Sequence, residues 1–165
     1  MPFALTLRLD AAAEARVESL QARLDAAGIG HPSLRLGHPP HITLAVAAQE
    51  PRRIALTPPP RLRLRLAHPG LFAAPERVLF LSPLATPELM VLQARAAEML
   101  GAFGLHPHFA RGAWVPHVTL ARDVPSFDAA LDALSPLELP LEAEVAALEL
   151  VAFPPARILA RRAAE

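Results

Sequence analysis

PPHITLAV, residues 39–46, recurs in closely similar form as VPHVTLAR at residues 115–122. The two histidines, His41 and His117, are separated by a little under half of the 165-residue chain. A repeat at this spacing indicates two similar halves, or two half-sites that face one another. The question for the rest of the sequence is what each half contributes.

Each copy of the repeat is expected to form a strand, over residues 41–46 and 117–122, with side chains alternating between two faces. One face carries an imidazole, a hydroxyl and a small alanine: His41, Thr43 and Ala45 in the first copy, and His117, Thr119 and Ala121 in the second. The other face is aliphatic and should be buried: Ile42, Leu44, Val46, Val118 and Leu120. The alanines would leave room for a ligand beside the polar groups.

The remainder of the chain predicts one α+β domain over residues 1–165. Alternating apolar residues indicate strands at 3–9, 61–67, 77–82 and 141–153, with a last strand at 156–162. Helices should begin after Asp10, Thr86 and Ser126 and extend to about residues 27, 100 and 134, because these three residues are good N-caps. Residues 28–40, 69–75 and 105–114 read as loops. Each half then supplies a helix followed by a motif strand, which is an internal pseudo-symmetry.

The composition narrows the class of protein. Hydrophobic residues make up 53% of the chain, which favours a folded domain, and no apolar run approaches the roughly 20 residues that span a bilayer. No signal peptide is visible, so we expect a cytoplasmic protein. The net charge is zero, which disfavours binding along a nucleic-acid duplex but allows contact with a few phosphates. Cysteine, lysine and tyrosine are absent, which excludes thiol or lysine nucleophiles and a tyrosine acid.

Two histidines with two hydroxyls suit phosphoryl chemistry. Imidazole has a reference pKa of about 6.5, so one ring can be neutral and the other protonated near neutral pH. The neutral ring can take a proton from water, and the charged ring can give one to a leaving oxygen. Thr43 and Thr119 can donate hydrogen bonds to the anion between the rings, and this chemistry needs no metal.

The motifs His41-Ile42-Thr43-Leu44 and His117-Val118-Thr119-Leu120 resemble those of the two-histidine phosphoesterase superfamily. The nearest resemblance is to its RNA 2′,3′-cyclic phosphodiesterase branch, historically called 2′-5′ RNA ligase, and it extends over most of the chain. It implies a bilobal fold in which two mainly antiparallel sheets face a central cleft, with the helices outside. It also implies metal-independent opening of 2′,3′-cyclic phosphates to 2′-phosphates, together with reversible 2′-5′ RNA ligation, in a monomer without cofactors. The expected partners are RNA termini or small cyclic nucleotides.

Three further residues are candidates for substrate contacts. Arg122 ends the second motif strand and is expected to contact phosphate, although exposed arginine is common on any surface. Phe72 and Trp114 can stack on a base, but aromatic residues in loops often only seal a core.

Two alternative functions stay open at this point. One is a non-catalytic module that binds RNA or nucleotides in the same cleft. The other is a metal-dependent hydrolase that uses His38 and His41, spaced as His-Pro-Pro-His, as ligands. No third acidic ligand lies nearby in sequence, and His106 and His108 read as ordinary loop histidines, so we expect no metal site.

Overall fold

The computed structural model describes residues 1–32, 37–52 and 54–165. The strands of this part of the chain are β1 (Phe3–Leu9), β2 (His31–Pro32), β3 (His41–Ala47), β4 (Arg63–Phe72), β5 (Val78–Pro83), β6 (Val118–Arg122), β7 (Leu141–Ala152) and β8 (Arg157–Ala163). The α-helices are α1 (Ala11–Ala26), α2 (Pro87–Gly101) and α3 (Phe127–Ala133). A short 3-10 turn, Pro107–Phe109, interrupts the expected loop before the second motif.

The three helices begin where the capping residues predict. The Asp10 carboxylate accepts hydrogen bonds from the backbone N–H groups of Ala12 and Ala13, which have no partner within the helix. Thr86 and Ser126 each accept the N–H three residues further on. These side chains therefore fix the register of each helix against the strand that precedes it.

The strands form one connected sheet of eight strands in the described residues. Its main path runs β1-β3-β6-β5-β4-β7-β8, and β1 also pairs with β7, so that the first six strands of the path close into a ring. The link between β3 and β6 is narrow, a single residue pair between Ile42 and Val118. The α+β class and the antiparallel pairing are as expected. The expectation of two separate sheets is wrong, because β7 pairs with strands of both halves and the two motif strands touch.

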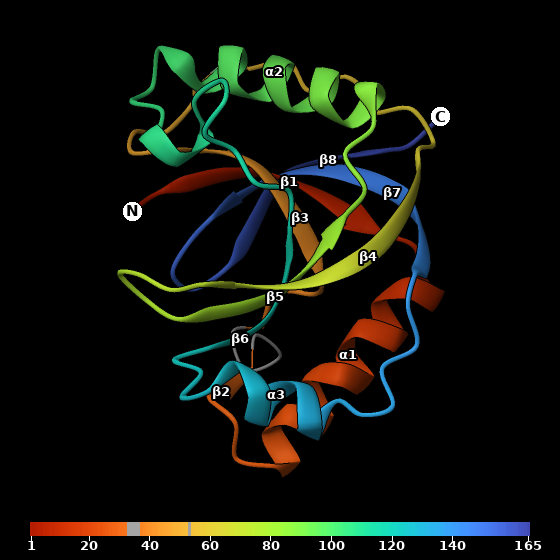
Figure 1. Cartoon of the computed structure of the whole chain (residues 1–165). Helices are drawn as coiled ribbons and strands as arrows, with labels where there is room; N and C mark the ends of the chain where they lie inside the picture. The colour runs from red at the N-terminus through yellow and green to blue at the C-terminus, as the bar shows by residue number, and fades with distance from the viewer. Residues whose placement is uncertain (33–36, 53) are drawn as a thin grey trace.

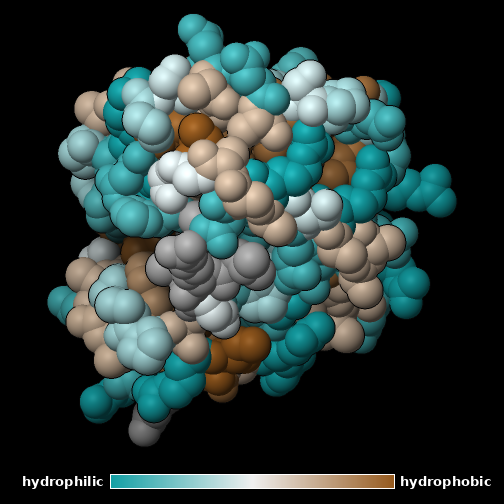
Figure 2. All heavy atoms as spheres, turned by 90° about the horizontal axis from the view of Figure 1, so that it is seen from below, coloured by the Kyte–Doolittle hydropathy of each residue, from teal (hydrophilic) through white to brown (hydrophobic). Residues whose placement is uncertain are grey.

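The helices lie on opposite sides of the sheet (Figure 1), with α2 on one side and α1 and α3 on the other. On the α1 and α3 side the surface is mostly hydrophilic, with small and separate hydrophobic spots (Figure 2). None of the helices in the described residues is long and apolar enough to cross a bilayer. The helices thus cover the sheet from two opposite sides (Figure 1).

β4 differs from its expected range. It begins at Arg63 and continues through Pro69 and Gly70 to Phe72, where a loop was expected. Pro69 is tolerated because it lies in a register where β5 continues to pair with its neighbours. Gly70 is required, since a Cβ atom at this position would lie 2.5 Å from the ring of Phe80 on β5. The extension places Phe72 next to the second motif.

Candidate active site

The two motif strands lie side by side and antiparallel, joined at Ile42 and Val118. Continuing this register by one residue in each direction places His41 opposite Thr119 and Thr43 opposite His117. Directly opposed residues share a face of the sheet, with Cβ atoms about 4.5–5.5 Å apart, and diagonal neighbours are about 7–8 Å apart. The two imidazoles are therefore diagonal to each other, with a hydroxyl beside each. A small pocket is lined by His41 and Thr119 together with Gln21, His38, Pro39 and Pro40.

Both motif strands contain a β-bulge at the same position. In β3, Ala45 pairs with Leu5 and Thr43 pairs with Thr6, which leaves Leu44 without an opposite residue on β1. The equivalent residue of β6 is Leu120, which β5 leaves without an opposite residue in the same way. A bulge inserts one extra residue, so alternation is shifted after it.

The bulges correct the expected distribution of side chains after each threonine. Ala45 and Ala121 are fully buried beside the leucines before them, and they do not share a face with the histidines. Val46 and Arg122 are only partly buried and return to the face of the threonines. The prediction that Ile42 and the leucines are buried is confirmed. The predictions that Val46 is buried and that the alanines leave space for a ligand are wrong.

Two buried glutamines, which sequence reasoning missed, hold backbone carbonyls of the motif strands from opposite sides of the sheet. Gln21 of α1 donates its side-chain amide to the Thr119 carbonyl at 3.0 Å. Gln93 of α2 donates to the carbonyls of Leu44, at 3.4 Å, and Phe109, at 2.8 Å. Both glutamines lie on the apolar stripe of their helix and are almost fully buried. A glutamine on an apolar helix stripe could have predicted this contact from the sequence, because a buried amide needs a hydrogen-bond partner.

The two histidines are held in the same way. The Nδ1 of His41 lies 2.8 Å from the Pro39 carbonyl, and the Nδ1 of His117 lies 2.8 Å from the Val115 carbonyl. A carbonyl oxygen only accepts, so Nδ1 carries the hydrogen in both rings. In the neutral state each ring therefore has its lone pair on Nε2, which is the atom available for proton transfer.

Both imidazoles are easier to deprotonate than free histidine. The pKa of His41 is lowered to about 3, chiefly by burial and then by the charges of His38, His117 and Arg8, against the hydrogen bond to Pro39. Burial also lowers the pKa of His117, with a smaller contribution from Arg122, against its backbone hydrogen bond. In the free protein both rings are thus neutral at pH 7, and a bound anion is needed to favour a proton on either.

Arg122 and Phe72 lie close to the second motif. Arg122 is half-exposed on the same face as Thr119, and its guanidinium donates to the Glu76 carboxylate at 2.5 Å. The Phe72 ring meets the His117 ring edge-on, with 5.0 Å between centroids. The structure brings both residues to the histidine, as a contact with substrate requires.

The interpretation of Trp114 as a stacking platform is wrong. Its side chain is buried, with 8% exposed, and its indole N–H donates to the Thr43 carbonyl at 2.9 Å. Trp114 thus belongs to the core that supports the first motif strand, and its faces are not free for a base.

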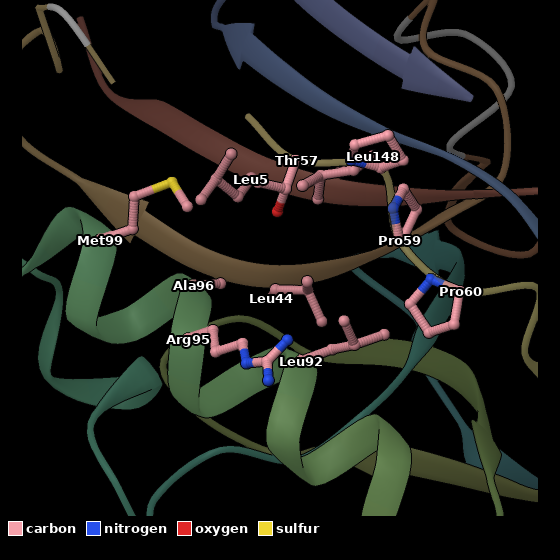
Figure 3. Close-up of a pocket in the computed structure, with 11 residues that line it drawn as sticks. Leu5, Leu44, Thr57, Pro59, Pro60, Leu92, Arg95, Ala96, Met99 and Leu148 are labelled. Atoms are coloured by element: carbon pink, nitrogen blue, oxygen red, sulfur yellow. The ribbon is translucent and has the colours of Figure 1, made fainter. Parts of the chain in front are cut away.

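Among the described residues, no three or more histidine or acidic side chains are arranged to hold a metal ion. A larger pocket lies between α2 and the back of the sheet (Figure 3), and it is lined largely by aliphatic side chains and prolines. Its charged lining residue is Arg95, and no histidine reaches it.

Comparison with solved structures shows the same fold elsewhere. E. coli LigT in apo form matches with a TM-score of 0.66 and 20% identity, covering 99% of this chain and 96% of that one. TT0787 of Thermus thermophilus matches with a TM-score of 0.64 and 20% identity, covering 99% and 97%. Usb1 of Kluyveromyces marxianus is more distant, with a TM-score of 0.52 and 12% identity over 96% and 97%. At these identities the likeness shows the fold alone.

No curated protein sequence matches the chain at a significant level. The model of the 2'-5' RNA ligase superfamily, in contrast, matches residues 9–154. This range includes both motif strands, both supporting helices and all of β7. The chain belongs to the 2'-5' RNA ligase superfamily.

Proposed function

We propose that the protein is a metal-independent phosphodiesterase that opens 2′,3′-cyclic phosphates of RNA ends or nucleotides to 2′-phosphates. The observation that supports the proposal is the pairing of Ile42 with Val118, because continuing that register by one residue each way would put two imidazoles and two hydroxyls on one face. Diagonal neighbours about 7–8 Å apart at Cβ leave space for a phosphoryl group between the rings. In-line displacement needs a base and an acid on opposite sides of phosphorus, and this arrangement supplies both.

The reaction follows from the free Nε2 atoms. The neutral ring takes a proton from water through Nε2 while the water oxygen forms a bond to phosphorus. The bond from phosphorus to the ribose O3′ breaks, and the protonated ring delivers its Nε2 proton to that oxygen. The 2′-phosphate is left, and the two rings have exchanged their charge states. The backbone hydrogen bonds of His41 and His117 at Nδ1 keep both rings in the orientation that these transfers need.

Negative charge grows on the non-bridging oxygens during this step. The Thr43 and Thr119 hydroxyls lie on the same face and can donate to those oxygens, which lowers the barrier when the donors are already in place. Arg122 adds a cation near the second motif, although it must be shared with Glu76. We therefore assign phosphate binding to these three residues.

The ligands in solved structures of a relative suggest the size of the substrate. E. coli LigT has been crystallised in complex with 3'-AMP and with phosphate. A nucleotide-sized ligand in this protein would place its phosphate between the motifs and its base beside Phe72, next to His117. Stacking on an aromatic ring tolerates any base, so this contact gives affinity with little sequence preference.

The test is a turnover assay on a 2′,3′-cyclic nucleotide, with and without a chelator. Wild type should hydrolyse it to the 2′-phosphate in both conditions. His41→Ala and His117→Ala should each lose about 10²–10⁴-fold in rate, and the double variant should be little worse than either single variant, because the rings act as a unit. Binding without turnover would instead indicate a binding module, and activity that requires a divalent ion would indicate a metal-dependent hydrolase.

A further inference from the structure

The two motif copies have different neighbours across the sheet. His41 pairs with Arg8 on β1, and Thr43 pairs with Thr6. In the second half, Thr119 pairs with Phe80 on β5, whose ring also lies 5.4 Å from that of His117. The first half-site therefore has polar and charged surroundings, whereas the second has aromatic ones.

A fully buried carboxylate lies behind the first half-site. Glu149 of β7 pairs with Thr6 and has no exposed surface. Its Oε1 lies 3.3 Å from the guanidinium groups of Arg8 and Arg161. Its Oε2 has no hydrogen-bond partner among the described residues, and the described atom that faces it is the Nε2 of His38 at 3.6 Å. A buried carboxylate oxygen without a hydrogen bond is costly, so a ligating group is expected there.

His38 has the complementary deficit. Its Nε2 is also buried, and the part of the chain that the structure describes gives it no hydrogen-bond partner. An approach of about half an ångström would bring the two atoms to ordinary hydrogen-bond distance and satisfy both. The other side of the His38 ring packs on His41, with 4.1 Å between ring centroids and 36° between ring planes. Glu149, His38 and His41 thus form a continuous row that ends at the motif.

We propose that Glu149 and His38 act through His41, holding its ring in place and giving it the role of general base, so that His117 is left as the general acid. The role assignment rests on the proposed function, whereas the effect of the pair on His41 does not. Glu149 and His38 are positioning residues in this proposal, since neither touches the substrate.

The physical reason is electrostatic. The charge of His38, whose ring stacks on His41, lowers the pKa of His41, because a cation beside a ring disfavours a second proton there. A neutral His41 with its lone pair on Nε2 is a base. Burial alone would raise the pKa of Glu149, but His38, Arg8 and Arg161 together hold it below its usual value, so the carboxylate is ionised at neutral pH. The charged and titratable groups around His41 and this row, from every element that packs there, are Arg8, Glu14, His38, His117, Glu149 and Arg161.

Nothing equivalent lies behind the second motif in the described part of the chain. The residue three positions before His117 is Trp114, where the first copy has His38. Trp114 donates to the Thr43 carbonyl and carries no charge. The proposal therefore predicts that perturbing the pair changes one histidine and spares the other.

The test uses His38→Gln and Glu149→Gln, with two controls. Glu14→Gln disturbs the same network at Arg8 but leaves the Glu149 and His38 contact. His108→Gln removes an exposed histidine far along the chain. The titrations of the His41 and His117 ring protons are followed by NMR without substrate, which gives an internal comparison in each variant. Circular dichroism confirms that each variant is folded, and His38→Gln, which keeps the Glu149 carboxylate and its ion pairs with Arg8 and Arg161, serves if Glu149→Gln does not fold.

In His38→Gln the pKa of His41 should rise by about one unit. The pKa of His117 should not change in this variant, and in the two control variants the pKa of neither histidine should change. With a cyclic nucleotide, kcat should fall about 10- to 100-fold, as for other groups that orient a functional histidine, with little change in KM. The acidic limb of the kcat/KM profile should move to higher pH, because the base must be neutral. Equal shifts in both histidines, or no shift in either, would overturn the pair's role.

A shift of the basic limb instead would show that His41 is the acid and overturn the role assignment. If wild type does not hydrolyse any cyclic nucleotide, the proposed function fails, whereas the titrations still decide whether the pair acts on His41. The two failures are therefore distinguishable.

Discussion

Lowering the pH from 7 to 5 should destabilise the protein, and His41 should account for about 2 kcal/mol of that loss. In the folded state the pKa of His41 is lowered to about 3, so the ring stays neutral over this range. In the unfolded chain its pKa returns to about 6.5, and it takes up a proton below that pH. A group whose folded pKa is depressed favours unfolding as the pH falls, because the unfolded state binds more protons.

The magnitude follows from the two pKa values. Between pH 7 and pH 5 the unfolded state gains about RT ln 25, or about 2 kcal/mol, from protonation of one such ring, and the folded state gains almost nothing. Any folded-state pKa of His41 below about 4 gives the same result. Glu149 contributes little between pH 7 and pH 5, because its pKa is lowered from a value that is already below this range.

The assay is urea unfolding of wild type and His41→Gln at both pH values, with His108→Gln as the control. The variant should lose about 2 kcal/mol less than wild type between pH 7 and pH 5, and the control should behave as wild type. Equal losses in wild type and His41→Gln would show that the ring is protonated in the folded state. The account of a neutral, buried His41 would then be wrong.

Three further predictions concern the substrate. Thr43→Val and Thr119→Val should each lower kcat by roughly 10²-fold, the scale of one lost oxyanion donor; a loss of affinity at constant kcat would assign the hydroxyls to ground-state binding. Arg122→Ala should raise KM about 10-fold, the scale of one charge-assisted hydrogen bond. An unchanged KM would show that Arg122 pairs with Glu76 and does not contact the substrate. Phe72→Ala should weaken binding of a nucleoside cyclic phosphate by about 1–3 kcal/mol without changing the affinity for inorganic phosphate, and equal losses for both ligands would refute base stacking.

The secondary structure could be read from the sequence largely because its signals are local. Caps at Asp10, Thr86 and Ser126 and strict apolar alternation fixed the helices and strands to within a few residues. The extension of β4 through Pro69 and Gly70 could not be read this way. Turn residues normally end a strand, and only the ring of Phe80, which comes from another strand, explains why a glycine is needed there.

The bulges were invisible for a related reason. Alternation predicts that Ala45 shares a face with Thr43, and it assumes that each strand residue has one partner. A bulge depends on how the neighbouring strand pairs, so the repeated Thr-Leu-Ala sequence alone does not predict it. The consequence is specific to the site, because the bulge of β6 is what turns Arg122 to the face of Thr119.

The motif repeat predicts which groups reach the phosphoryl site but not which role each plays. His41 and His117 are followed by nearly the same residues, Ile-Thr-Leu-Ala and Val-Thr-Leu-Ala, and each makes the same kind of Nδ1 hydrogen bond. Their own sequences therefore do not show which ring is the acid and which is the base. Their difference comes from strands remote in sequence, since β1 and β7 supply Arg8 and Glu149 to one ring while β4 and β5 supply aromatic rings to the other. Acid–base catalysis needs one ring neutral and one charged, and a fully symmetric site would populate the two possible assignments equally. Inequivalent neighbours remove that ambiguity, and for this reason the residues that decide the roles are expected behind the motifs, outside the repeat itself.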